Sequence, residues 1–202
     1  MLKQIVLASN NKGKLAELQA MFAPLGLQLI PQGELNIPEA EEPFHTFVEN
    51  ALAKARHASQ LSGLPAVADD AGLCVDAFHG LPGVQTAYYC TQFGYPKSDD
   101  NNRKALLEQM ATQTNRRAAL VSTLVAVLDP SDPEPLIAVG RVVGEITHEP
   151  LGDNGFGFDP VMLMPSLGQT FAQMPEAQKN AISHRGQSAR LMCELMRERW
   201  LA

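Results

Sequence analysis

Apolar stretches typical of strands alternate along this chain with stretches in which apolar residues recur at helical spacing. The first apolar stretch, residues 4–8, predicts a buried strand. A helix is predicted next, because apolar residues recur every three to four positions at Leu15, Leu18, Met21, Phe22 and Leu25. Residues 27–30 predict a second strand, and a strand–helix–strand crossover joins parallel strands. The chain therefore opens with a β–α–β unit.

The next elements follow from a helix-start signal and from short apolar runs. Thr46 and Glu49 have the spacing of a capping box, which predicts a helix from this point onward. Residues 65–68 predict a short buried strand that stops at Asp69 and Asp70, and residues 73–78 resume an extended apolar pattern. The remaining predicted elements are a helix over 98–110, a strand over 120–128, an antiparallel partner strand over 136–143, and a helix over about 183–200. The mixture predicts an α/β domain with a mixed sheet.

Composition limits the size of the fold and its partners. The 202 residues are 45% hydrophobic and show no internal repeat or low-complexity linker, so we expect a single domain over residues 1–202, with room for two lobes. The net charge of −6 argues against nucleic-acid or membrane-surface binding. An anionic ligand is still possible, but a few lysines and arginines or a metal ion must balance its charge locally.

Cysteines and the N-terminal sequence indicate a cytoplasmic protein. Cys74, Cys90 and Cys193 have neither metal-binding nor CxxC spacing, and an odd number of scattered cysteines is typical of reduced thiols. No signal peptide or long apolar span is recognised, so neither secretion nor membrane insertion is expected.

The turn between the first strand and the first helix is a candidate phosphate site. A strand that runs directly into a helix places unpaired N–H groups and the positive end of the helix dipole at the turn, where they favour an anion. A hydroxyl, two amides and two ammonium groups lie at this turn, which consists of Ser9, Asn10, Asn11, Lys12, Gly13 and Lys14. The alternative is an ordinary helix cap, because Ser and Asn are common capping residues.

Two acidic pairs are candidate ligands for a divalent cation. Asp69 and Asp70 follow a predicted buried strand, and ligands of α/β sheets bind at the carboxyl ends of strands. Glu41 and Glu42 lie in a predicted loop, and carboxylates of this kind suit a hard cation such as Mg²⁺. The alternatives are a plain Asp-Gly turn and a solvated acidic loop.

The last third of the chain contains two further candidate sites. Aromatic rings alternate with glycines in Phe156-Gly157-Phe158-Asp159, so a flat ligand could approach the backbone and stack. Lys179 and Ser183-His184-Arg185 form a donor-rich group at a helix start, which suits base carbonyls or phosphates. The alternatives are a tight corner packed on the core and a helix cap with solvated charges.

These motifs together resemble the Ham1/RdgB family of inosine triphosphate pyrophosphatases, which act on non-canonical purine nucleoside triphosphates. The resemblance spans nearly the whole chain and is specific because the motifs occur in the right order. They are Ser9-x-Asn11-x-x-Lys14, Glu41-Glu42, Thr46-Phe47-Val48-Glu49-Asn50-Ala51, Ala68-Asp69-Asp70-x-Gly72-Leu73, Gly80-Leu81-Pro82-Gly83, Gly155-Phe156-Gly157-Phe158-Asp159-Pro160 and Ser183-His184-Arg185-Gly186.

The resemblance implies a fold, a reaction and an assembly. The fold is a two-lobed α/β domain with a long mixed sheet flanked by helices and the nucleotide in the cleft between the lobes. The reaction is Mg²⁺-dependent cleavage between the α- and β-phosphates of ITP, XTP or their deoxy forms, which gives a nucleoside monophosphate and pyrophosphate. The assembly is usually a homodimer.

The resemblance also implies roles for individual residues. Asp70 would be the general base, and Glu41 and Asp70 would bind Mg²⁺. The residues implied in substrate binding are Ser9, Asn10, Asn11, Lys12, Gly13, Lys14, Lys54, Ala71, Phe156, Gly157, Phe158, Asp159, Lys179, His184 and Arg185.

The chain departs from the family pattern at two positions. Tyr88 stands where the family commonly has arginine, and Ala71 stands where it commonly has serine, so one hydroxyl contact is absent. Neither departure affects the implied metal ligands. Two alternatives stay open: a related pyrophosphatase for other modified nucleotides, and a nucleotide sensor without catalysis.

Overall fold

The strands of the computed structural model, which describes residues 2–201, form one mixed sheet. The order of the seven strands across the sheet is β2-β1-β3-β4-β5-β6-β7. β1 pairs in parallel with β2 and β3, whereas β6 pairs antiparallel with β5 and β7. The strands are β1 (Gln4–Leu7), β2 (Gln28–Pro31), β3 (Ala66–Val75), β4 (Arg117–Val127), β5 (Leu136–Ile146), β6 (Met162–Met164) and β7 (Gln169–Thr170). The predicted α/β class with a mixed sheet is confirmed.

The helices agree with the predicted ones and add elements that the sequence pattern did not reveal. The α-helices are α1 (Lys12–Phe22), α2 (Phe47–Ser62), α3 (Asp99–Met110), α4 (Glu176–Ile182) and α5 (His184–Arg199). Thr46 caps α2 by accepting from the amide of Glu49, and Ser98 caps α3 by accepting from the amide of Asn101. The short helix α4 and a 3₁₀ segment over Gly83–Phe93 were not predicted.

The chain divides into two compact units, and each contains hydrophobic core residues of its own. Unit 1 comprises Met1–Asp70, Ser122–Gly140 and His184–Ala202, and unit 2 comprises Ala71–Val121 and Arg141–Ser183. Strands β3, β4 and β5 contribute residues to both units. That these units make up a single domain stays a prediction.

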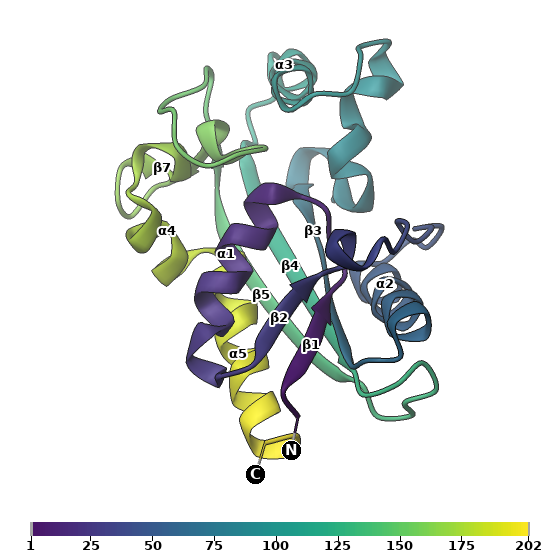
Figure 1. Cartoon of the computed structure of the whole chain (residues 1–202). Coiled ribbons are helices and arrows are strands. Elements are labelled where there is room, and N and C mark those ends of the chain that lie inside the picture. The colour runs from purple at the N-terminus through teal and green to yellow at the C-terminus, as the bar shows by residue number, and fades with distance from the viewer. Residues whose placement is uncertain (1, 202) are drawn as a thin grey trace. The chain divides into compact units, whose positions relative to one another are not determined.

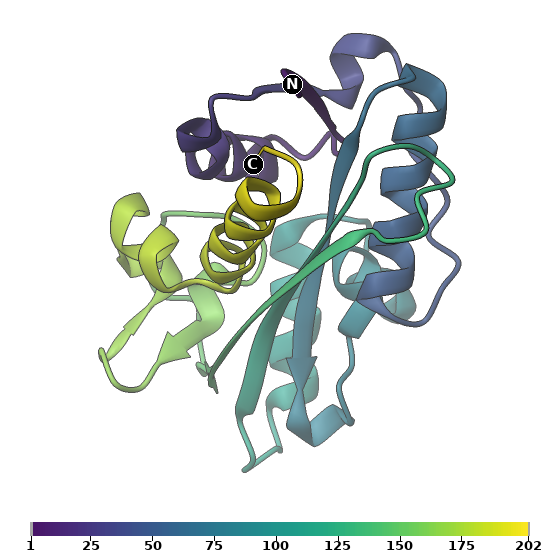
Figure 2. The same cartoon turned by 90° about the horizontal axis from the view of Figure 1, so that it is seen from below.

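Alternating side chains of the strands build two cores in unit 1. Ile5 and Leu7 of β1 face α1 and α5, whereas Val6 and Ala8 face the small residues of α2, as the period of two in a strand requires. Helices α1 and α5 run side by side on one face of the sheet, and α2 covers the other (Figure 1), as the view from below in Figure 2 also shows.

A glycine in β5 permits the close approach of α5. A Cβ atom on Gly140 would overlap the carbonyl oxygen of His184 and lie 2.7 Å from the amide nitrogen of Ser188. The first turn of α5 therefore packs directly on the backbone of β5.

The core of unit 2 includes the aromatic rings of Tyr89, Phe158 and Phe171. Leu73, Leu106 and Met110 pack with Phe158 and Phe171. Helix α3 contributes its apolar face to this core, and its N-terminal turn lies at the loop that carries the Gly155–Pro160 motif.

The prediction that a strand stops at Asp69 and Asp70 is wrong. Strand β3 continues through both aspartates to Val75. A strand can bury two carboxylates only if cations compensate them. Such partners are present for both, as described below, and the turn preference of Asp and Gly is overridden. Among residues 2–201, none of the helices has the length and apolar character needed to cross a bilayer.

Candidate active site

The turn before α1 is shaped by its own side chains. Asn11 is the N-cap of α1 and accepts from the amide of Lys14 at 3.0 Å, while the Ser9 hydroxyl accepts from the amide of Asn11 at 3.2 Å. The capping alternative is thus correct for Asn11. Asn10 donates to Glu39 at 3.4 Å, and Lys12 is exposed. The first turn of α1 contains no acidic residue, so its amide end keeps its preference for an anion.

Lys14 extends from α1 to a fully buried carboxylate, Asp69. Its Nζ lies 3.0 Å from Asp69 Oδ2, and the Arg185 guanidinium donates to the same oxygen at 3.1 and 3.2 Å. The other oxygen, Oδ1, accepts from the Ser122 hydroxyl at 2.6 Å. Burial alone would raise the pKa of Asp69, but Lys14, Arg185 and the Ser122 hydrogen bond hold that pKa well below its ordinary value. Asp69 is therefore an anion at neutral pH and fixes two cations. Burial lowers the pKa of Lys14, an effect that Asp69 only partly offsets.

Arg185 is buried in an ion-pair network. Its Nη1 donates to Glu17 Oε2 at 2.6 Å, and only 2% of the residue is exposed. Burial would lower its pKa, but Asp69 and Glu17 outweigh that and raise it. Glu17 and Ser122 were not among the residues predicted from the sequence.

Asp70, the next residue, has a different environment. Its Oδ1 lies 2.8 Å from the Nζ of Lys54, which also pairs with Glu42 at 3.3 Å. Its Oδ2 is buried and has no hydrogen-bond partner among the described residues. Burial raises the pKa of Asp70, and Lys54 offsets this only in part. For Lys54, burial would lower the pKa, but Asp70 and Glu42 outweigh that and raise it. Asp70 thus has one ion-paired oxygen and one oxygen without a hydrogen-bond partner among the described residues.

The predicted metal ligand Glu41 is exposed in the loop before α2, and it is the neighbouring Glu42 that pairs with Lys54. Within residues 2–201, no three His, Cys, Asp or Glu side chains come together as a metal site. Carboxylate oxygens are nevertheless the donors that Mg²⁺ prefers, and it commonly uses one or two of them. The unpartnered oxygen of Asp70 fits such an ion. That Glu41 also binds the metal stays a prediction.

In unit 2, the Gly155–Pro160 motif forms a tight loop held by Asp159. The Oδ2 of Asp159 accepts from the Phe156 amide at 2.9 Å and pairs with Lys179 Nζ at 2.6 Å. A Cβ atom on Gly155 would overlap that same oxygen, so glycine is required there. Lys179 Nζ also lies 4.8 Å from the centre of the Phe156 ring.

The two aromatic rings of this motif have different surroundings. Phe158 is 5% exposed and belongs to the core of unit 2, whereas Phe156 is half-buried. Phe156 is therefore the ring on which a flat ligand could stack, and Phe158 anchors the loop. The corner alternative is correct for Phe158.

The other predicted residues lie next to these groups in the chain. Ala71 follows Asp70 within β3 and is half-buried. His184 is the first residue of α5 and is 5% exposed. The structure thus brings together Lys14, Lys54, Asp70 and Arg185 in unit 1, and Phe156, Asp159 and Lys179 in unit 2.

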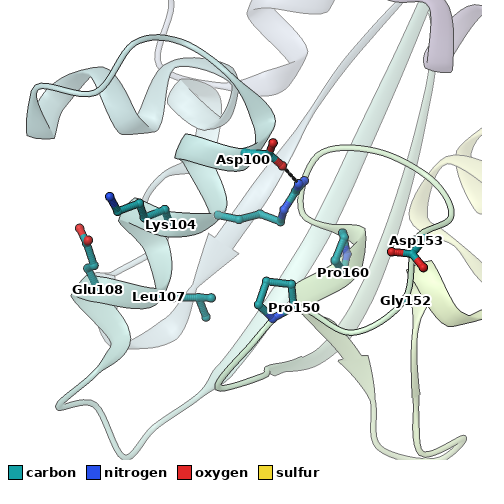
Figure 3. A pocket seen from close by; sticks show the side chains of 9 residues that line it. Asp100, Lys104, Leu107, Glu108, Pro150, Gly152, Asp153 and Pro160 are labelled. Atoms are coloured by element: carbon teal, nitrogen blue, oxygen red, sulfur yellow. Dashed lines mark hydrogen bonds and ion pairs between the residues drawn. The ribbon is translucent and has the colours of Figure 1, made fainter.

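A pocket of about 620 Å³ lies in unit 2, between α3 and the loop that precedes Pro160 (Figure 3). None of the predicted site residues lines it. Its lining residues are Asp100, Arg103, Lys104, Leu107, Glu108, Pro150, Gly152, Asp153 and Pro160. This pocket is therefore distinct from the candidate site.

Known proteins of one family are similar to this chain in sequence. The Ham1 family profile matches residues 5–195. A dITP/XTP pyrophosphatase of Albidiferax ferrireducens (strain ATCC BAA-621 / DSM 15236 / T118) is 76% identical over 198 residues, which cover 98% of this chain and 100% of that protein. A dITP/XTP pyrophosphatase of Acidovorax sp. (strain JS42) is 72% identical over 199 residues, with 98% and 97% covered.

A solved structure agrees with these relatives. The HAM1 protein from Coxiella burnetii superimposes with a TM-score of 0.89 at 42% identity, over 98% of this chain and 100% of that one. The match extends through both units, and it confirms the resemblance drawn from the sequence motifs. The chain belongs to the Ham1 family.

Proposed function

We propose that this protein hydrolyses dITP, XTP and related non-canonical purine nucleoside triphosphates to the monophosphate and pyrophosphate. The observation that carries the proposal is the buried Asp70 oxygen without a partner, in a cluster that also contains Lys54 and lies next to the Lys14–Asp69 pair. The relatives of 76% and 72% identity that are named dITP/XTP pyrophosphatases support the choice of substrate.

The phosphates bind to groups of unit 1 in this proposal. The amide end of α1 and the Ser9 hydroxyl provide hydrogen-bond donors, and Lys14 and Lys54 provide positive charge. Asp69 orients Lys14 through the 3.0 Å ion pair, so the ammonium group is held in place before the substrate arrives.

Mg²⁺ would be held by Asp70 together with Glu41, and the remaining ligands would be phosphate oxygens and water. When bound, the ion neutralises phosphate charge and favours the in-line geometry of phosphoryl transfer. Asp70 takes a proton from the water whose oxygen attacks the α-phosphorus. The bond from that phosphorus to the bridging oxygen breaks, and pyrophosphate leaves with the electron pair. A base in this position contributes about 10²–10⁴-fold to the rate.

The base is recognised by ring stacking and by hydrogen-bond donors in this proposal. Phe156 stacks on the purine ring. Hypoxanthine and xanthine present an acceptor at position 6, where adenine presents a donor, so donors such as His184, Arg185 and backbone amides favour the 6-oxo bases. A buried donor left unpaired by adenine costs about 1–3 kcal/mol, which is roughly one to two decades in efficiency. Arg185 would have to serve this role while paired with Asp69 and Glu17.

A substrate panel tests the proposed function. The protein is incubated with Mg²⁺ and, separately, dITP, ITP, XTP and the four standard triphosphates, and pyrophosphate and orthophosphate are measured. We expect pyrophosphate from the non-canonical purines, with ATP cleaved at least tenfold less efficiently. Orthophosphate as the product, intact nucleotide after long incubation, or a preference for modified pyrimidines would overturn the proposal.

We propose in addition a homodimer and a cytoplasmic location. The homodimer follows from the family resemblance. The location is supported by Cys74, Cys90 and Cys193, which are free thiols. Light scattering coupled to gel filtration measures the first, and thiol titration of the protein freshly released from cells measures the second.

A further inference from the structure

Helix α3 bonds both polar backbone groups of Gly157, the residue between the two aromatic rings of the loop. Asp99 Oδ2 accepts from the Gly157 amide at 2.8 Å, and Arg103 Nη1 donates to the Gly157 carbonyl at 2.6 Å. Asp99 and Arg103 are four residues apart in α3, so they lie on one helix face. Two side chains of one helix thus hydrogen-bond the amide and the carbonyl of a single loop residue.

These two hydrogen bonds restrict the orientation of the Phe156 side chain. On one side of Gly157, Phe158 is fixed in the core of unit 2. On the other side, Phe156 is only half-buried, and its own amide is bonded to Asp159. Gly157 has a φ of +59°, a conformation that glycine adopts without steric cost and that a flexible loop would readily leave. Its two hydrogen bonds to α3 therefore set how the Phe156 ring is presented.

Packing between α3 and the loop is incomplete on either side of the Gly155–Phe158 segment. The pocket of about 620 Å³ separates part of the helix from the loop, and Arg103 lines it. Figure 3 shows Lys104 and Leu107 on the helix side and Pro150, Asp153 and Pro160 on the loop side. Because side chains do not fill this space, the hydrogen bonds at Gly157 add to the packing of Phe158 in holding the loop to α3.

Arg103 is itself held in place. Its Nη2 pairs with Asp100, one turn earlier on α3, and only 16% of its side chain is exposed. Since the guanidinium is planar and has several donors, one edge can bind Asp100 while Nη1 reaches the Gly157 carbonyl. Such an arrangement presents a fixed donor rather than a mobile charge.

We propose that Asp99 and Arg103 are positioning residues for base binding, because they fix Gly157 and thereby the Phe156 ring on which the purine stacks. This inference rests on the proposed function in that it takes Phe156 as the stacking residue. Neither Asp99 nor Arg103 needs to touch the substrate. Removing either side chain weakens the binding of ligands that contain a base. It does not change the binding of ligands that consist only of phosphates.

The test compares a base-bearing with a base-free ligand. The variants are Asp99→Ala and Arg103→Met, which each remove one bond, and Asp99→Asn and Arg103→Lys, which retain an acceptor and a donor. Lys104→Met is the matched control: it removes the same charge from the next position of α3, and Lys104 contacts the Tyr95 ring instead of the loop. The measurements are KM and kcat for dITP, the Kd of inosine monophosphate without metal, and the Ki of inorganic tripolyphosphate.

We expect Asp99→Ala and Arg103→Met to raise the dITP KM and the inosine monophosphate Kd by about tenfold each. The tripolyphosphate Ki should stay within twofold of wild type, which also shows that the variants are folded. Asp99→Asn and Arg103→Lys should recover part of the loss, and Lys104→Met should behave as wild type.

Two results would overturn the inference. One is an inosine monophosphate Kd within twofold of wild type in both Asp99→Ala and Arg103→Met. The other is an equal loss of affinity for tripolyphosphate and inosine monophosphate, which indicates general damage to the fold. Failure of the wild-type protein to cleave dITP contradicts the proposed function instead, and the inosine monophosphate Kd values then decide on the positioning role.

Discussion

Asp69 and Asp70 are neighbours in β3, yet their carboxyl groups have different partners and opposite pKa shifts. Asp69 is bonded through both oxygens, to Lys14, Arg185 and Ser122, and its pKa is held low by those partners against the effect of burial. Asp70 has one bonded oxygen, and burial raises its pKa. The alternation of side chains along a strand explains the contrast, since successive residues point to opposite faces of the sheet. Asp69 therefore stabilises the site, and Asp70 is left available for chemistry.

The substitution Asp69→Asn should lower the free energy of unfolding at pH 7 by about 3–5 kcal/mol, because it leaves buried cations without their counter-charge. The folded-state pKa of Asp69 lies below its ordinary value of 3.8, so its ionic contribution is fully present above that pH and is lost as the pH falls through the lower folded value. Urea unfolding between pH 7 and pH 2 measures both effects, and the variant should lose less stability on acidification.

Asp70→Asn is the matched control for this prediction. A raised folded pKa means that the carboxylate is less favourable in the folded protein than in the unfolded chain at neutral pH. Replacing it with a neutral amide should therefore cost little stability or increase it. An equal destabilisation by the two asparagine variants would contradict the assignment of their environments.

At the scale of elements, close contacts between backbones place the groups of the site. The first turn of α5 carries His184 and Arg185, and Gly140 of β5 lets that turn approach the sheet. Arg185 reaches Asp69 from this turn, so the ion-pair network depends on how closely α5 packs.

Gly140→Ala should therefore be destabilising by about 1–3 kcal/mol, because the added methyl group overlaps the His184 carbonyl and pushes α5 away from β5. Val139→Ala, at the neighbouring exposed position of the same strand, is the control and should change stability much less. Thermal unfolding of both variants makes the comparison. A Gly140→Ala protein as stable as the control would show that α5 is free to shift.

The sequence predicted those elements whose pattern is local. The β–α–β opening, α2 with its Thr46 cap, helix α3, and the long strands β4 and β5 follow from local sequence patterns. The continuation of β3 through Asp69 could not be predicted in this way. Its carboxylate is compensated by Arg185, which lies 116 positions away, and no local signal reports such a partner.

The candidate site was also only partly predictable. The residue types and their order drew attention to the turn before α1, to Asp69 and Asp70, and to the Gly155–Pro160 loop, whose roles in binding stay predictions. The sequence did not separate Phe156 from Phe158, because only the structure shows which ring enters the core. For the same reason the supporting contacts of Glu17, Ser122 and Asp99 were missed, since each is a polar residue on a helix or strand with an ordinary local pattern.

At the scale of the whole molecule, charge limits how a triphosphate can bind. The protein has a net charge of −6. Unit 1 contains two ion-paired groups, one around Asp69 and one around Asp70. Together they hold three cations, Lys14, Lys54 and Arg185, and four carboxylates, Glu17, Glu42, Asp69 and Asp70. The two groups therefore have no excess of positive charge with which to bind a polyphosphate anion on their own.

Removal of divalent metal should consequently weaken binding of the nucleotide as well as stop its cleavage. We expect the Kd of a non-hydrolysable ITP analogue to rise by at least tenfold in EDTA and to recover when Mg²⁺ is restored. Calorimetry with and without the metal measures this directly. Equal affinity in the two conditions would mean that lysines and amides alone bind the phosphates.

The central claim is that the Asp70 carboxylate, with its one unpartnered oxygen, carries the chemistry, and turnover of the Asp70→Asn variant tests it most directly. The asparagine keeps the shape of the side chain and an acceptor for Lys54 but cannot take a proton from water. With dITP and Mg²⁺, the variant should lose about 10²–10⁴-fold in kcat, while the Kd of inosine monophosphate stays within a few-fold of wild type. Near-normal release of pyrophosphate by Asp70→Asn would contradict the claim.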